Sequence, residues 1–137
     1  MSAVEKAAAD GYTLIVTVDN GISAIAEAER AAALSVDMVI TDHHIPSDTL
    51  PNAAAVIDPH LDEGGPFSDL CGVGVAFKLI CALDGRPCEE MIYEYADLVT
   101  LGTIADVVPL HGENRMMVSI GLKVMNRTPR VGVRALM

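Results

Sequence analysis

The sequence predicts an α/β fold, in which helices cover a mostly parallel, Rossmann-like sheet to give a three-layer sandwich. Three short apolar runs, at 13–18, 38–41 and 54–57, have the pattern of strands, and an aspartate follows each of them. Segments rich in alanine and leucine, with helical spacing, separate the runs or follow them. Strands that alternate with helices are joined by right-handed crossovers and therefore lie parallel.

The first half of the chain begins with a predicted helix over 2–10, where helix-forming residues are followed by Gly11 as a C-terminal cap. The first apolar run then predicts a strand that is buried on both faces. Ser23 is expected to cap the next helix, over 24–34. The remaining two strands follow this helix, and the segment between them contains proline.

Helices are predicted to dominate the second half of the chain. A loop over 60–70 comes first, and Ser68 or Asp69 is expected to cap the helix that follows it. Pro129 is expected to mark the end of the last helix. The predicted helices lie over 71–83, 87–101 and 114–126.

The composition indicates a globular domain. The 137 residues are 51% hydrophobic, which is enough to bury a core, and only 4% are aromatic. No apolar run approaches the roughly 20 residues needed to cross a membrane, and the chain start does not resemble a signal peptide. We therefore expect a cytoplasmic protein without a membrane partner. Three cysteines without a CxxC pair indicate reduced thiols.

The charge distribution is uneven. The net charge of −10 argues against a surface that binds nucleic acid everywhere, because such binding depends on Lys and Arg. All nineteen acidic residues, however, lie before Asn114, and no acid follows it. The basic stretch after Asn114 is compatible with a phosphate-facing or domain-contacting strip, and equally with a solvated helix face. Its cations are Arg115, Lys123, Arg127, Arg130 and Arg134.

The tetrapeptide TDHH, at 41–44, is the most informative local feature. It directly follows a predicted strand and offers a carboxylate with two imidazoles. This mixture suits manganese, iron, cobalt or zinc better than a cage made only of oxygen. Because neighbouring side chains diverge, we expect one of the two histidines to bind the metal and the other to face the substrate. The alternative is a pair of loop histidines without a ligand.

Two further aspartates are candidate metal ligands. Asp106 lies among apolar neighbours, where a buried carboxylate is costly unless a cation or hydrogen bonds compensate it. The alternative for Asp106 is a surface cap at a helix start. Asp19 ends the first predicted strand, and Asn20 and Gly21 turn the chain after it. The alternative for Asp19 is therefore that it only shapes this turn. Asp58 has a weaker case, because Asp-Pro is a common turn signal.

Read together, three segments resemble motifs of the DHH phosphoesterase family: VDNGIS at 18–23, TDHH at 41–44 and GTIADVVPL at 102–110. Two further blocks are similar to the RecJ exonuclease branch of that family. They are GVGVAFKL at 72–79 and GENR at 112–115, the latter followed by GLKVMNRTPRVGVRAL. The resemblance covers nearly the whole chain.

The resemblance implies a two-metal site that takes Mn²⁺ or Mg²⁺. Asp19 would bridge the two cations, and His43 with Asp106 would complete the shell of one of them. Two cations lower the pKa of a bridging water and neutralise charge on the phosphate. The implied reaction is hydrolysis of a phosphodiester without a covalent enzyme intermediate.

The resemblance also implies the substrate and the residues around it. His44 would contact the scissile phosphate or help the leaving oxygen, and Asp42 would orient a histidine or the metal-bound water. Asn20 and Gly21 would contact the substrate. The implied substrate is single-stranded DNA, degraded from its 5′ end in DNA repair and recombination.

The resemblance divides the chain into a partial DHH domain over 1–110 and a helical extension over 111–137. The chain departs from the family pattern at the family's first motif, an aspartate-rich DxDG stretch. This motif and the strand that carries it would lie before residue 1. We therefore expect weak metal binding and little nuclease activity from this chain alone, and an exposed sheet edge that a homodimer could cover.

Two alternatives remain at this stage. One is a DHH phosphodiesterase that acts on short oligonucleotides or cyclic dinucleotides, or on pyrophosphate. The other is a RecJ-like scaffold without catalytic activity, which the presence of Asp19, His43, His44 and Asp106 opposes.

Overall fold

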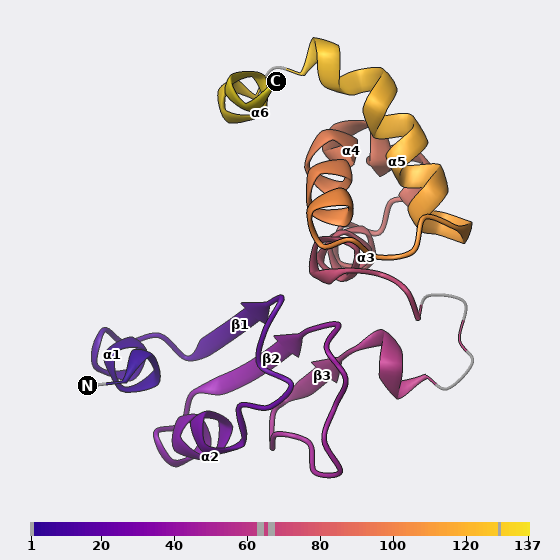
Figure 1. Cartoon of the computed structure of the whole chain (residues 1–137). Helices are drawn as coiled ribbons and strands as arrows, with labels where there is room; N and C mark the ends of the chain where they lie inside the picture. Colours follow the sequence, from indigo (N-terminus) through magenta and orange to yellow (C-terminus); the bar gives the residue numbers. More distant parts are fainter. Residues whose placement is uncertain (1, 63–64, 66–67, 129) are drawn as a thin grey trace. The chain divides into compact units, whose positions relative to one another are not determined.

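The computed structural model describes residues 2–62, 65, 68–128 and 130–137. The chain forms two compact units, Met1–Ser68 and Asp69–Met137. The first contains the sheet and the second is helical within the described residues (Figure 1).

Three parallel strands form the sheet of the first unit: β1 (Leu14–Val18), β2 (Asp37–Thr41) and β3 (Ala55–Ile57). Their order is β1-β2-β3, and their arrows point the same way in Figure 1. The register pairs Val18 with Thr41 and Thr41 with Ile57, so all three strands end at the same edge. The predicted α/β class with a parallel sheet is confirmed.

Two helices, α1 (Ala3–Ala9) and α2 (Ile25–Ala33), pack with the sheet of the first unit. Ser2 caps α1 in a capping box, since its hydroxyl accepts from the Glu5 amide while the Glu5 carboxylate accepts from the Ser2 amide. A core forms between the helices and one face of the sheet. Its buried members are Val4, Ala28, Ala31, Val36, Met38 and Ile40.

Two sequence predictions for this unit are wrong. Ser23 does not cap α2: the cap position is Ala24, which makes no side-chain hydrogen bond to the helix. Strand β1 is not buried on both faces, because Leu14, Val16 and Val18 are each about half exposed. The reason is that β1 lies at an edge of the three-stranded sheet and the core covers only one of its faces.

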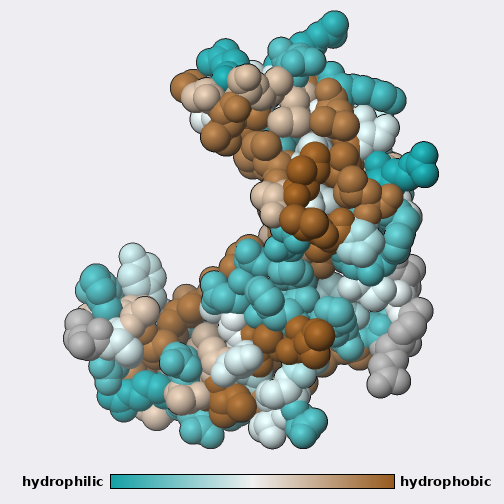
Figure 2. Space-filling model, in the orientation of Figure 1, coloured by the Kyte–Doolittle hydropathy of each residue, from teal (hydrophilic) through white to brown (hydrophobic). Residues whose placement is uncertain are grey.

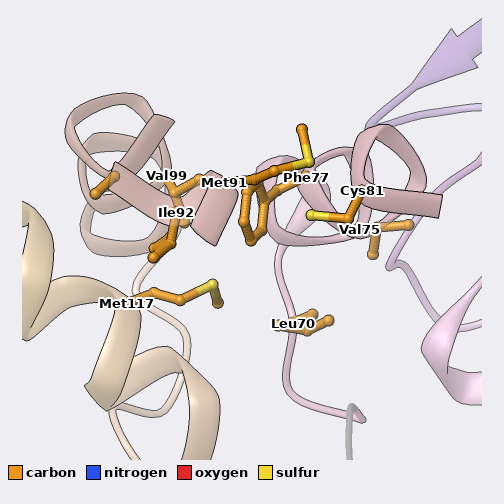
Figure 3. Close-up of a cluster of buried hydrophobic side chains, with 9 residues drawn as sticks. Leu70, Val75, Phe77, Cys81, Met91, Ile92, Val99 and Met117 are labelled. Carbon is orange, nitrogen blue, oxygen red and sulfur yellow. The ribbon is translucent and has the colours of Figure 1, made fainter. Parts of the chain in front are cut away.

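The second unit is built on three helices, α3 (Gly72–Asp84), α4 (Cys88–Ala105) and α5 (Gly112–Val124). Helix α4 contacts both of the others. Figure 3 shows their shared core, which includes Phe77 from α3. The other buried members are Leu70, Val75, Cys81, Met91, Ile92, Ala96, Val99 and Met117. Apolar side chains also reach the surface of this unit, where brown areas lie over its helices in Figure 2.

Close approach of α4 and α5 depends on Gly121. A Cβ at this position would overlap the hydroxyl of Thr100 and the carbonyl oxygen of Ala96. Any larger residue would therefore force the two helices apart.

Several predicted boundaries in the second half differ from the structure. The cap position of α3 is Cys71, not Ser68 or Asp69, and α4 continues beyond 101 to Ala105. The predicted loop over 60–70 begins within a short 3₁₀ helix, η1 (Pro59–Leu61), and its residues 63–64 and 66–67 lie outside the described residues, as does Pro129. After α5 come a second 3₁₀ turn, η2 (Met125–Arg127), and a helix the sequence did not predict, α6 (Val131–Leu136).

The cysteines are all free, with Cys71 and Cys81 buried and Cys88 half-buried. Burial and a hydrogen bond with Cys88 raise the pKa of the Cys81 thiol to about 12. Among the described residues, none of the helices has the length and apolar character required to span a membrane.

A buried ion pair ties the segment before α6 to α4. Asp97 is 2% exposed and accepts hydrogen bonds from the Thr128 hydroxyl, the Leu98 amide and, at 2.9 and 3.0 Å, the Arg130 guanidinium. Burial by itself raises the pKa of Asp97, but these hydrogen bonds outweigh it and hold the pKa below its ordinary value. The folded state therefore keeps Asp97 ionised.

Replacing Asp97 by asparagine should destabilise the chain in a pH-dependent manner. The lowered pKa means that the carboxylate stabilises the fold above its unfolded pKa of about 4, and that this contribution is lost as the pH falls through the folded value. Asp97→Asn should lower the free energy of unfolding by about 1–3 kcal/mol at pH 7. Urea denaturation at pH 7 and pH 3 measures this difference, which should shrink at pH 3. The control is Asp48→Asn, which changes an exposed aspartate. If Asp97→Asn lowered the free energy of unfolding equally at both pH values, ionisation of Asp97 would not be what stabilises the fold.

Candidate metal centre

The candidate site lies where the three parallel strands end. Backbone pairing continues for one residue past β1 and β2, since the Asp19 amide donates to the Thr41 carbonyl and the Asp42 amide to the Ile57 carbonyl, both at 3.0 Å. The residue after each strand is an aspartate, so carboxyl groups gather at one edge of the sheet. Open parallel sheets bind ligands at this edge.

Asp19 and His43 meet across this edge. The Nε2 of His43 lies 3.0 Å from the Oδ1 of Asp19, and the His43 side chain is 12% exposed while that of Asp19 is 59% exposed. Asp19 has a left-handed backbone, with φ of 62°. Such a φ is uncommon outside glycine, although aspartate adopts it more readily than most residues. The turn therefore presents a solvent-accessible carboxylate to a largely buried imidazole.

Asp42 is the anchor of the turn after β2. It is 1% exposed, and its Oδ2 accepts from the Ile22 amide at 2.9 Å. Its Oδ1 accepts from the His43 amide at 2.8 Å and lies 2.6 Å from Nδ1 of His44. Burial raises the pKa of Asp42, but the hydrogen bonds from Ile22, His44 and His43 outweigh it and lower the pKa. An ionised, buried carboxylate thus fixes the orientation of His44.

The structure brings Asp19, His43 and His44 together. Each offers one ligand atom, and these atoms all lie within 4.8 Å of one another. The two rings are 4.5 Å apart between centroids, so the adjacent histidines do not diverge as expected from the sequence. One carboxylate oxygen with two imidazole nitrogens fits a divalent cation such as Mn²⁺ or Zn²⁺. The residues present therefore fit a metal ion.

Asn20 and Gly21 form the turn between Asp19 and the Ile22 amide. The Asn20 side chain donates to the Val18 carbonyl at 3.2 Å. Gly21 has φ of 113°, and a Cβ there would lie 2.7 Å from the Thr17 hydroxyl. Both residues thus shape the turn, while contact of either with a substrate stays a prediction.

Asp106 does not have the environment that the sequence indicated. It is exposed and occupies the C-terminal cap of α4, so both the expected burial and the alternative of a helix-start cap are wrong. The residue after it, Val107, has a left-handed backbone with φ of 58°. Asp106 belongs to the helical unit, whereas the His43 cluster belongs to the sheet unit. Whether these groups share a metal stays a prediction.

Asp58 is more buried than a simple turn residue. It is 7% exposed, and its Oδ1 accepts from the His60 amide at 2.9 Å as the cap of η1. Its Oδ2 is buried and makes no hydrogen bond within the described residues. The sequence signal for Asp58 was its position after a strand, which it shares with Asp19 and Asp42.

A parallel sheet whose carboxyl edge carries a carboxylate and imidazole cluster defines a candidate metal-binding α/β domain. Comparison with known proteins gives the family. The domain family described as "DHH family, N-terminal domain" matches residues 2–103. The chain belongs to the DHH family.

Relatives with similar sequences are single-stranded-DNA-specific exonucleases named RecJ. The Bacillus subtilis protein is 47% identical over an alignment of 129 positions, which covers 92% of this chain and 16% of the relative. The Escherichia coli protein is 45% identical over an alignment of 147 positions, gaps included, which covers 98% of this chain and 26% of the relative. The chain thus spans about a quarter or less of these relatives.

Solved structures that are similar to this chain in fold are also of RecJ exonucleases. A crystal structure of exonuclease RecJ bound to manganese matches with a TM-score of 0.84 and 37% identity, covering 99% of this chain and 34% of that one. RecJ from Thermus thermophilus in complex with Mn²⁺ matches with a TM-score of 0.81 and 38% identity, covering 97% of this chain and 20% of that one.

Gly21→Ala should destabilise the chain more than Gly11→Ala. Both glycines have positive φ, so both variants carry the strain of a left-handed alanine, about 1–2 kcal/mol. Only Gly21 also has a close neighbour, whereas a Cβ at Gly11 meets nothing within 4 Å. We expect an additional loss of about 1–3 kcal/mol for Gly21→Ala from overpacking. Urea denaturation of the two variants checks this, and equal losses would show that the turn after Asp19 is not tightly packed.

Proposed function

We propose that this chain is part of the catalytic core of a RecJ-like exonuclease, which hydrolyses single-stranded DNA from its 5′ end. The observation that carries the proposal is the cluster of Asp19, His43 and His44 at the carboxyl edge of the sheet. Membership of the DHH family supports a metal-dependent phosphoesterase. The names of the relatives support the DNA substrate.

The proposed metal ligands are Asp19, His43 and Asp106. The contact of 3.0 Å between Asp19 and His43 supports the first two, and Asp106 is proposed on its motif alone. Mn²⁺ is favoured over Mg²⁺, because imidazole suits manganese better and Mg²⁺ prefers oxygen. Two bound cations would lower the pKa of a water and neutralise charge on the phosphate.

His44 is proposed to contact the scissile phosphate. Its side chain is 61% exposed, while its Nδ1 is held by Asp42. With Nδ1 held, the other ring nitrogen can donate to a phosphate oxygen or lie near a cation. Asp42 is therefore proposed as a positioning residue, which acts through His44 and through the backbone of the turn. Asn20 and Gly21 are proposed to border the substrate, since they flank Asp19.

We also propose a partial DHH domain over 1–110 and a helical extension over 111–137. The family match to residues 2–103 supports the first range, although the compact units divide earlier, after Ser68. A homodimer through the edge of β1 is proposed because β1 is an edge strand of the sheet and its side chains Leu14 and Val16 are also half exposed. We also propose a cytoplasmic location, because a chromosomal DNA substrate would be found there.

Calorimetry with Mn²⁺ tests the metal site. We expect His43→Ala to weaken Mn²⁺ binding at least about tenfold relative to the unchanged chain, since even indirect ligand contacts are worth that much. The matched control is His111→Ala, in the helical unit, which should bind as the unchanged chain does. Because weak binding is expected from this chain alone, the titration extends to a large excess of Mn²⁺. No heat even there, together with a specific protein partner, would contradict the proposal and favour a scaffold without catalysis.

Hydrolysis assays with Mn²⁺ test the substrate class. Any turnover by the chain should be faster on long single-stranded DNA with a free 5′ end than on dinucleotides or cyclic dinucleotides. A preference for dinucleotides would instead assign the chain to the oligonucleotide-degrading phosphodiesterases of the family.

A further inference from the structure

A second candidate binding site lies within the helical unit. A hollow of about 600 Å³ opens between α4 and the segment formed by the end of α5, η2 and the start of α6. This volume falls within the range of small-molecule sites, about 300–1,000 Å³. Figure 1 shows this yellow segment beside the orange α4. The hollow is lined by Tyr93, Asp97, Lys123, Arg127, Thr128 and Arg130, among others.

The floor of this hollow is held by the buried ion pair of Asp97 and Arg130. Arg130 also donates to the Glu94 carbonyl at 2.7 Å and lies over the ring of Tyr95, 5.9 Å from its centroid. These contacts hold Arg130, at the start of α6, against α4. The wall that carries Arg127 is therefore fixed relative to the wall that carries Tyr93.

Positive charges are in excess along the hollow once the ion pairs are taken into account. Asp97 is neutralised by Arg130, and the Glu94 carboxylate pairs with Arg86 at 2.8 Å. Lys123 and Arg127 form no ion pair within the described part of the chain. The hollow therefore presents two uncompensated positive charges, in a chain whose net charge is −10.

An exposed aromatic ring faces the same hollow. Tyr93 lines it and is 66% exposed. Cations at the end of α5 also stabilise its helix dipole, but that effect does not account for an exposed tyrosine on the opposite wall. An aromatic platform with nearby cations is the arrangement by which proteins hold single-stranded nucleic acid, stacking a base and contacting the backbone.

From these observations we infer that this hollow binds one nucleotide unit of single-stranded DNA, with a phosphate near Lys123 and Arg127 and a base against Tyr93. The inference rests on the proposed single-stranded DNA substrate and adds a contact that involves no metal ligand. It also gives a role to the acid-free stretch after Asn114, which carries five of the nine basic residues.

Metal-free DNA binding tests the inference. Fluorescence anisotropy with a labelled oligothymidylate in EDTA measures affinity without a contribution from cations. The double variant Lys123→Gln/Arg127→Gln should bind at least about tenfold more weakly, and its salt dependence should fall by about 1.4 in slope, the value for two contacts to a single strand. The matched control, Arg115→Gln/Arg134→Gln, removes the same charge from the same stretch. It should change the affinity and its salt dependence far less.

The aromatic contact has its own test. Tyr93→Leu should weaken binding of the oligothymidylate about fivefold or more, whereas Tyr12→Leu, which changes a similarly exposed tyrosine of the sheet unit, should not. On an oligonucleotide of abasic sites, Tyr93→Leu and the unchanged chain should bind equally. Thymidine monophosphate should compete better than inorganic phosphate.

Three results would overturn the inference: no DNA binding by the unchanged chain, equal losses in the two double variants, or competition by phosphate as strong as by the nucleotide. None of these measurements involves a metal ion. If Mn²⁺ does not bind but DNA binds in a Tyr93-dependent manner, the metal site is refuted and the nucleotide site in the hollow stands. If Mn²⁺ binds but DNA does not, only the nucleotide site is refuted.

Discussion

The parallel register of β1, β2 and β3 is the constraint on which the candidate metal centre depends. It brings the three strands to an end at one edge, and the backbone pairs one residue beyond them through the Thr41 and Ile57 carbonyls. An antiparallel pairing of the same strands would place these ends at opposite edges. The parallel pairing instead gathers the carboxyl groups of Asp19, Asp42 and Asp58.

The acidic groups at this edge differ in their surroundings, and this difference divides their roles. Asp42 is buried and fully engaged with the Ile22 amide, the backbone of its own turn and the ring of His44. Asp19 is exposed and close to Nε2 of His43. A carboxylate that is saturated by internal hydrogen bonds is suited to hold other groups in place, whereas an accessible one is suited to bind a cation.

The sequence predicted the sheet and much of its edge, because the relevant signals are local. An apolar run followed by Asp42, His43 and His44 indicates both a strand and polar groups at its end. The partner of Asp42 could not be predicted, since the Ile22 amide comes from a turn twenty residues away and carries no side-chain signal. The same limit applies to Asp106: its apolar neighbours indicated burial, but Ile104 at the end of α4 and Val107 after the helix are themselves exposed, and so is the cap between them.

The proposed metal centre requires that an imidazole nitrogen at this edge bind a divalent cation. Pulsed electron paramagnetic resonance of the chain with bound Mn²⁺ is the sharpest test, because an imidazole ligand gives a nitrogen coupling that oxygen ligands such as water and carboxylate cannot give. We expect nitrogen coupling in the unchanged chain and its loss or reduction in His43→Ala. A spectrum of Mn²⁺ surrounded by oxygen alone, unaffected by the change at His43, would contradict it.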